Sequence, residues 1–228
     1  MTVRFFAPSL MTSVRFAAGF LTVAFIAMAC LVNPLSAWAE QAAGNGDDPQ
    51  SEAAVSALIQ MRLSNMLTAI GDSSLSNDTI IEELRSNVDF PAITRGVMGK
   101  AHRKAMNAAQ QARFQGEFEQ SMVVLLRSAL SGDEAYTVEA KQTRLSTKNP
   151  ERAQTFAVVS TPDGQQIDLI ASLAFVQGNW KVRNLIFEGI NLGRTYRSQF
   201  DQLMQDNGGN PDAAIDAWAE QVGETTPG

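Results

Sequence analysis

Few residues of this chain belong to the types that usually carry out chemistry. His102 is the only histidine and Cys30 the only cysteine. These numbers exclude most transition-metal sites, which need several such ligands, and no serine or acid close to His102 in the sequence indicates a catalytic triad. We therefore predict no metal site, no cofactor and no catalytic residue, and we expect His102 to be an exposed polar side chain.

The segment around His102 is basic, with cations at Lys100, Arg103 and Lys104. Such a run is usually a solvated helix surface, which is the simpler interpretation. The alternative is a docking patch for an acidic partner or for a lipid phosphate. These three cations are the candidate docking residues of the chain.

A second chemical candidate is a carboxyl group paired with a phenol. Asp168 and Tyr136 both lie in segments with strand periodicity, and a tyrosine with a buried aspartate is the combination used by ketosteroid isomerase. Asp168 alternates with Ile167 and Leu169, however, so we expect it on the face opposite the apolar row. An enzyme acting on an apolar small molecule in a cone-shaped fold is therefore the alternative hypothesis.

The elements that must position these residues change type near Gly132. Before it, apolar residues recur at helical spacing, as in Val55, Ile59, Leu63 and Met66. We predict helices over 51–71, from Asp78 or Thr79 onward, over 91–99 and over 107–132. Two more are predicted at the end of the chain, over 192–207 and over 211–222.

After Gly132 the periodicity becomes two, which indicates half-buried strands. Turn signals at 149–150, 162–164 and 177–179 separate four such segments. The fold class is therefore α+β, a curved four-strand antiparallel meander with helices packed on one face. We expect an apolar cavity between sheet and helices.

Two apolar surfaces could line that cavity: alternate positions of the strands, and a stripe on the long helix. A solid core explains both surfaces equally well, which leaves a periplasmic adaptor with surface docking patches as a third hypothesis. The candidate cavity-lining residues, which the family resemblance given below makes candidate lipid-binding residues, are Val97, Phe114, Phe118, Met122, Leu126, Tyr136, Val138, Leu169, Ala171, Leu173, Phe175, Trp180 and Val182.

The N-terminus reads as a secretory signal peptide over 1–39, with an apolar run followed by Ala37-Trp38-Ala39. We then expect a disordered leader over 40–50, one domain over 51–222 and a flexible tail over 223–228. Loss of Arg4 and Arg15 changes the net charge from −6 to −8. This acidity disfavours nucleic acid and anionic membrane surfaces as partners.

Three segments resemble the MlaC family: VDFPAITRGVMGKAHRKA at 88–105, ARFQGEFEQSM at 112–122 and NWKVRNLIFEGINLGRTYRSQF at 179–200. The last is the most specific, through the spacing of its Trp-Lys-Val, Glu-Gly and Tyr-Arg-Ser-Gln-Phe groups. The resemblance extends over about 77–222. It implies a periplasmic, monomeric phospholipid carrier.

The same resemblance implies the partners of the carrier. They are an outer-membrane lipoprotein–porin complex and an inner-membrane MCE-domain protein of an ABC transporter. Burying a methylene is worth about 0.8 kcal/mol, so two chains of ~15 carbons need a deep apolar pocket. We expect the strand face and the Phe114, Phe118 and Met122 stripe to form its walls.

Overall fold

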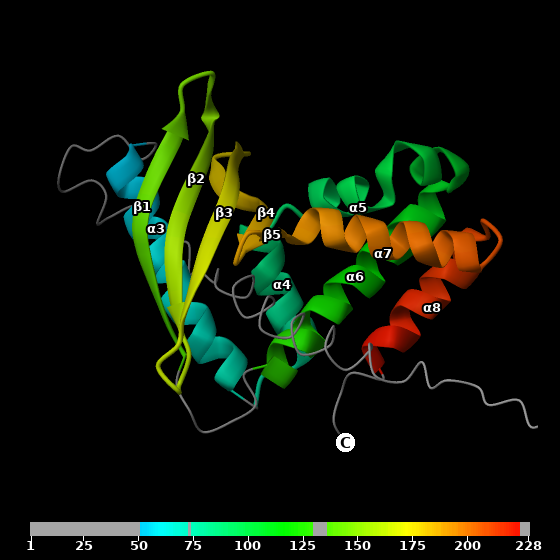
Figure 1. Cartoon of the computed structure of the whole chain (residues 1–228), viewed down its shortest axis with the longest axis horizontal. Helices are drawn as coiled ribbons and strands as arrows, with labels where there is room; N and C mark the ends of the chain where they lie inside the picture. The colour runs from blue at the N-terminus through cyan, green and yellow to red at the C-terminus, as the bar shows by residue number, and fades with distance from the viewer. Residues whose placement is uncertain (1–50, 73, 130–135, 224–228) are drawn as a thin grey trace, which may run out of the picture.

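The protein is described by a computed structural model that covers residues 51–72, 74–129 and 136–223. The predicted signal peptide, the predicted leader and residues 224–228 of the predicted tail lie outside these ranges. Six helices and five strands follow one another in the described ranges. Figure 1 shows α3 beside β1, and the helices α5 to α8 gathered past the opposite edge of the sheet, beyond β4.

The helices lie where they were predicted, except that α5 continues beyond its predicted end, and side chains cap several of them. They are α3 (Glu52–Gly71), α4 (Asn77–Asn87), α5 (Phe90–Ala105), α6 (Ala108–Ala129), α7 (Leu192–Asp206) and α8 (Pro211–Gly223). The predicted cap of α3 is confirmed, because the Ser51 hydroxyl accepts from the backbone N–H of Ala54. The predicted caps of α4 were wrong: the cap is Ser76, whose hydroxyl accepts from Thr79 N–H.

Helix α5 has a sharp kink at Gly99, where the sequence predicted its end. Gly99 has φ 64° and ψ 176°, a conformation that is open almost only to glycine. A second helical arm follows and carries the basic segment as far as Ala105. The guanidinium of Arg197 on α7 packs directly against the kink, 2.9 Å from where a Cβ would stand.

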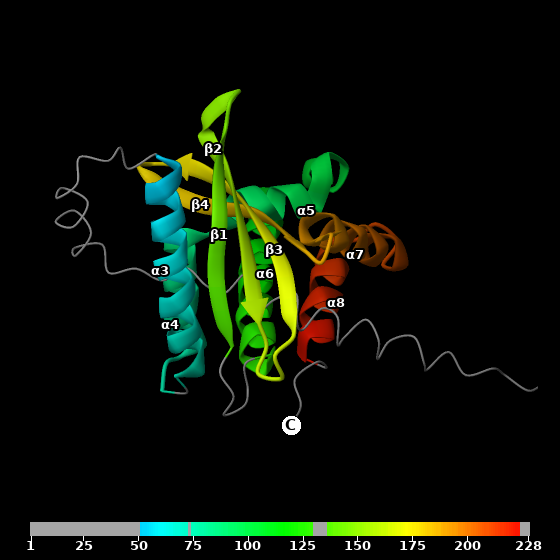
Figure 2. The ribbon, with the colours of Figure 1, turned by 60° about the vertical axis from the view of Figure 1, so that its left-hand side comes forward.

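The sheet is the predicted antiparallel meander, with one additional short strand. Its strands pair in chain order: β1 (Thr137–Ser146), β2 (Asn149–Ser160), β3 (Gln166–Val176), β4 (Asn179–Phe187) and β5 (Ile190–Asn191). The extra hairpin forms because Glu188 and Gly189 both have positive φ, at 46° and 76°, as a tight two-residue turn between β4 and β5 requires. Figure 2 shows strong twisting, with β4 at a wide angle to β1.

Helix α3 runs along β1 and covers the edge of the sheet. The Gln60 side chain substitutes for a neighbouring strand: its Nε2 donates to Val138 O at 3.0 Å, and its Oε1 accepts from Ala140 N–H at 2.6 Å. Eight residues earlier on α3, Glu52 Oε1 accepts from Leu145 N–H at 2.8 Å. The backbone groups of β1 that face away from β2 are thus partly satisfied by side chains.

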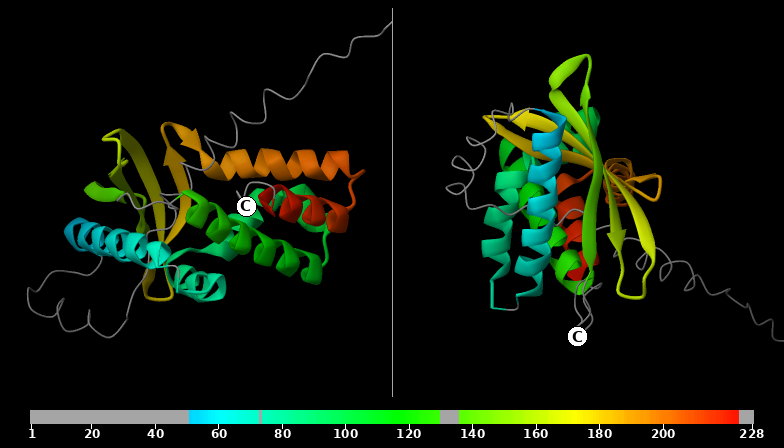
Figure 3. Two further views of the ribbon diagram at one scale, coloured as in Figure 1. Left: turned by 90° about the horizontal axis from the view of Figure 1, so that it is seen from below. Right: turned by 90° about the vertical axis from the view of Figure 1, so that its left-hand side faces the viewer.

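The helices beyond β4 pack around an aromatic cluster. Figure 3 shows α6, α7 and α8 side by side there. At its centre, Phe118 is 1% exposed and packs against Phe90, Phe114, Tyr196 and Trp218, with ring centroids 5.6 to 6.4 Å apart. This cluster and the inner face of the sheet belong to one continuous apolar core.

Candidate functional site

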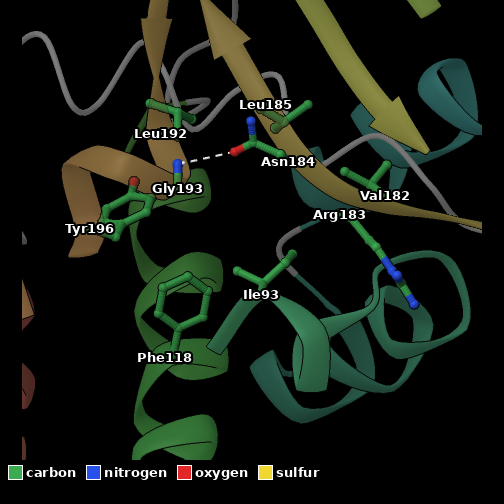
Figure 4. Close-up of a pocket in the computed structure, with 9 residues that line it drawn as sticks. All are labelled: Ile93, Phe118, Val182, Arg183, Asn184, Leu185, Leu192, Gly193 and Tyr196. Atoms are coloured by element: carbon green, nitrogen blue, oxygen red, sulfur yellow. Dashed lines mark hydrogen bonds between the residues drawn. The ribbon is translucent and has the colours of Figure 1, made fainter. Parts of the chain in front are cut away.

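The two parts of the core meet at an apolar junction where α5, α6 and α7 approach β4 (Figure 4). Ile93, Phe118 and Tyr196 point toward one another there, whereas Arg183 points away. Arg183 instead pairs with Asp89, at 2.7 Å. The junction is lined by Ile93, Phe118, Val182, Arg183, Asn184, Leu185, Leu192, Gly193 and Tyr196.

Two local features fix this junction. Gly193 N–H donates to Asn184 Oδ1 at 3.2 Å, and a Cβ on Gly193 would lie 2.7 Å from that oxygen, so glycine permits the close approach of α7 to β4. Burial raises the pKa of Tyr196 well above its ordinary value. Its phenol therefore stays neutral at physiological pH.

The cavity at the junction has a volume of only about 20 Å³. That is room for about one water molecule and not for an acyl chain. The helices and strands thus meet here in closed packing, and a lipid chain could enter this interior only if the packing opened.

The candidate lipid-binding residues all lie in or against the continuous core, but they do not form two facing walls. Phe118 and Val182 line the junction. The stripe of α6 turns partly away from the sheet, because Phe114 packs on Phe200 and Trp218, with centroids 4.3 and 5.3 Å away. The other buried candidates are Val97, Met122, Leu126, Val138, Leu169, Ala171, Leu173 and Trp180, and the partly buried ones are Tyr136 and Phe175.

Sequence reasoning missed seven of the nine residues that line the junction, among them the apolar Ile93, Leu185 and Leu192 and the aromatic Tyr196. The signal for α7 was present, because Leu192, Tyr196 and Phe200 recur every four residues and all three are buried. Leu185 was hidden by a β-bulge near Arg183, which shifts the alternation of β4 by one residue.

The residues considered as chemical candidates, Asp168 and His102, do not come together in one site. Asp168 is exposed and pairs with Val158, on the face opposite Leu169, as its alternation predicted. His102 was expected to be freely exposed but contacts two residues of α7: its Nε2 is 2.8 Å from Asp201 Oδ1, and its ring packs edge-on against Phe200. In the described ranges, no group of three or more His, Cys, Asp or Glu could hold a metal ion.

The candidate docking cations occupy the second arm of α5, beyond the Gly99 kink. Lys100 and Lys104 are exposed and Arg103 is half-buried. Arg197, against the kink, adds a fourth cation beside this arm. An acid, Asp201 of α7, contacts both His102 of this arm and Arg197.

A buried polar region lies where α3, α4 and the start of β4 meet. Arg62 of α3 donates through Nη1 to Trp180 O at 2.8 Å and through Nη2 to Asn179 Oδ1 at 2.6 Å. The amide of Asn179 in turn donates to Ser86 O, in the last turn of α4. Glu83, one turn earlier on α4, has a buried Oε2 without a hydrogen-bond partner among the described residues.

Glu83 gives a prediction for the pH dependence of stability. Burial raises its pKa above the ordinary 4.5. A carboxyl group whose pKa is raised in the folded state contributes most to the free energy of unfolding below pH 4.5, where it is protonated in both states. This stability is lost as the pH rises through the folded pKa. We therefore expect Glu83→Gln to be more stable than the wild type at pH 7 and to have a higher Tm. The gain in unfolding free energy should be less than ~1 kcal/mol, because water screens the site.

Thermal unfolding of the wild type and of Glu83→Gln between pH 3.5 and 8 would measure this effect. The two Tm values should converge below pH 4.5. Glu151→Gln, at an exposed carboxylate of β2, is the matched control. It should have the wild-type Tm throughout this pH range. A variant no more stable than the wild type at pH 7 would show that ionised Glu83 is not a destabilising group.

Taken together, these features define a class: an α+β protein in which a twisted antiparallel meander and helices close over a continuous apolar core. The family follows from a comparison with known families, in which the MlaC model, described as MlaC protein, matches residues 54–220. The chain belongs to the MlaC family, which confirms the resemblance seen in the sequence.

Proteins similar to this chain include the following two. The toluene tolerance protein ttg2D of Pseudomonas putida is 31% identical over 137 residues, which are 59% of this chain and 62% of that protein. The match therefore spans less than two thirds of the relative. A phospholipid-binding protein from Ralstonia solanacearum, solved in complex with a phospholipid, has the same fold, with a TM-score of 0.63 and 19% identity over 78% of this chain and 100% of that one.

Proposed function

We propose that this protein is a periplasmic phospholipid carrier and not an enzyme. It takes lipid from an outer-membrane lipoprotein–porin complex and exchanges it with an inner-membrane MCE-domain ABC transporter, with the acyl chains buried between sheet and helices. One observation carries the proposal: a member of this fold was solved with a phospholipid, and the present chain of the MlaC family has one uninterrupted apolar core that joins its sheet to its helices.

The physical basis is the solubility of the acyl chains. Two chains of ~15 carbons would lose ~20 kcal/mol or more if they were exposed to water, so a carrier must enclose nearly their whole length. The junction holds only about 20 Å³. Loading therefore requires the sheet and the helices to separate, and lipid replaces the contacts that close the core in its absence.

Mass spectrometry of an organic-solvent extract tests the carrier directly. The mature protein purified from its own periplasm should yield phospholipid in stoichiometric amount. A stable, lipid-free monomer that also takes up no lipid from vesicles would contradict the proposal and favour an adaptor with a solid core.

We further propose that Lys100, Arg103 and Lys104 dock the carrier on an acidic surface of a partner protein. The cations lie together on one short arm with little acidic compensation nearby. Charges at the rim of an interface mainly speed association, so Lys100→Glu with Lys104→Glu should slow lipid transfer to a reconstituted transporter about tenfold at low salt.

Lipid loading should remain unchanged in this double variant. Lys148→Glu, at an exposed position of the β1–β2 turn, is the control and should transfer lipid at the wild-type rate. Equal rates for the double variant and the wild type at low salt would exclude this arm as the docking surface.

A further inference from the structure

Arg62 is a buried cation that forms no ion pair with any described residue, Glu83 included. It is 2% exposed, and within the described part of the chain it forms hydrogen bonds only to neutral acceptors, Trp180 O and Asn179 Oδ1. Burial without a compensating carboxylate lowers its pKa to about 10. Buried charges in proteins are normally paired, because removal from water is unfavourable for a lone ion.

The guanidinium and its neighbour both keep unused donors. The Nε of Arg62 and the indole Nε1 of Trp180 are buried, and neither has a hydrogen-bond partner among the described residues. The two residues are in direct contact through the bond from Arg62 to Trp180 O. That bond goes to the main-chain oxygen of Trp180 and does not fix the direction of its indole, so the buried donor beside the uncompensated charge is the Nε–H of Arg62.

The position of Arg62 joins a polar boundary to an apolar interior. On one side is the β3–β4 turn, where Gln177 and Gly178 are exposed. On the other side, Ile59 and Met66 lie three residues before and four after Arg62, on the same face of α3, and both are buried in the core. An amphiphile has the same order of parts: a charged group followed at once by apolar chains.

We propose that Arg62 binds the phosphate oxyanion of the carried phospholipid. The planar guanidinium fork matches phosphate oxygens and remains charged at physiological pH. The phosphate supplies the missing negative charge, and the acyl chains extend from it along the buried face of α3. This inference rests on the proposed carrier function and adds a specific contact for the headgroup.

The test compares two lipids with the same acyl chains, one with a phosphate-containing headgroup and one without it. Wild-type protein, freed of lipid, is offered dioleoyl phosphatidylglycerol and, separately, dioleoylglycerol, and both affinities are measured. We expect the phospholipid to bind at least about tenfold more tightly, as a charge-assisted hydrogen bond provides. Arg62→Met should bring the two affinities together by weakening phospholipid binding alone, and Arg62→Lys should retain part of the preference.

Arg127→Met is the matched control. Arg127 of α6 also has a buried Nε without a partner among the described residues, and it also donates to a backbone carbonyl, that of Leu75. It should keep the wild-type preference. Phosphorus NMR gives a second readout, because the resonance of bound phosphatidylglycerol should shift on loading in the wild type and in Arg127→Met, and not in Arg62→Met.

Each contrary result has a distinct meaning. If folded Arg62→Met keeps the wild-type preference, Arg62 is only a structural tie between α3 and β4, and the proposal is wrong while the carrier function stands. If the wild type binds neither lipid, the carrier function fails as well. If inorganic phosphate alone binds as tightly as the phospholipid and with the same dependence on Arg62, the site is a general anion site and the assignment to lipid is wrong.

Discussion

Replacing Phe118 by alanine should lower the free energy of unfolding by about 3–5 kcal/mol, the range measured for large-to-small changes at buried aromatic residues. Phe118 is 1% exposed and packs against four other rings drawn from α5, α6, α7 and α8. It also lines the junction with β4. Its removal would leave a cavity exactly where helices and sheet are joined, so the surrounding rings cannot all collapse into the space.

Urea unfolding of the lipid-free protein, followed by tryptophan fluorescence, would measure the loss. Phe156→Ala is the control, because Phe156 lies on β2 and is only partly buried; we expect it to cost about 1 kcal/mol. Comparable losses in the two variants would mean that the aromatic cluster does not hold the helices and the sheet together.

Replacing Gly99 by alanine should be the second severe change. The φ of 64° and ψ of 176° would strain any other residue by about 1–3 kcal/mol. The new Cβ would also lie 2.9 Å from a guanidinium nitrogen of Arg197 and displace that side chain. We expect a loss of about 2–3 kcal/mol, together with reorientation of the arm that carries the candidate docking cations.

Gly96 provides a control of opposite sign, three residues earlier on the same helix. It is exposed, and a Cβ there would meet nothing within 4 Å. Gly96→Ala should therefore stabilise α5 by about 0.5–1 kcal/mol, because alanine loses less conformational freedom than glycine in a helix. Differential scanning calorimetry of both variants decides the matter: a Gly99→Ala protein as stable as Gly96→Ala would show that the kink is not required.

Local patterns in the sequence were sufficient for the elements and their order. The alternation of Ile167, Leu169, Ala171 and Leu173 predicted β3, and turn residues predicted the hairpins. Gly99 was predicted to end its helix, because a glycine in a helical pattern is typical of a helix end and of a kink alike. The sequence around Gly99 does not distinguish the two, since the kink packs against Arg197 of another helix. Strand β5 was missed because a two-residue strand has no periodicity to detect.

The candidate site was predictable in composition and not in geometry. That the apolar residues are buried follows from their spacing, but which helix each one meets depends on tertiary packing. Phe114 therefore lies against α7 and α8 and does not face the strands. Arg62 gave no signal at all, because an arginine on a helix is normally solvent-exposed, and its burial comes from the β3–β4 hairpin that reaches it from over a hundred residues away.

The covering of β1 by α3 also bears on self-association. Gln60 and Glu52 occupy backbone groups that could otherwise pair with a strand of another molecule. An uncovered edge strand is a template for intermolecular β-pairing and hence for aggregation. The side chains of α3 therefore also protect the protein against its own oligomerisation: any change that removed α3 from β1 would expose an edge strand and favour aggregation.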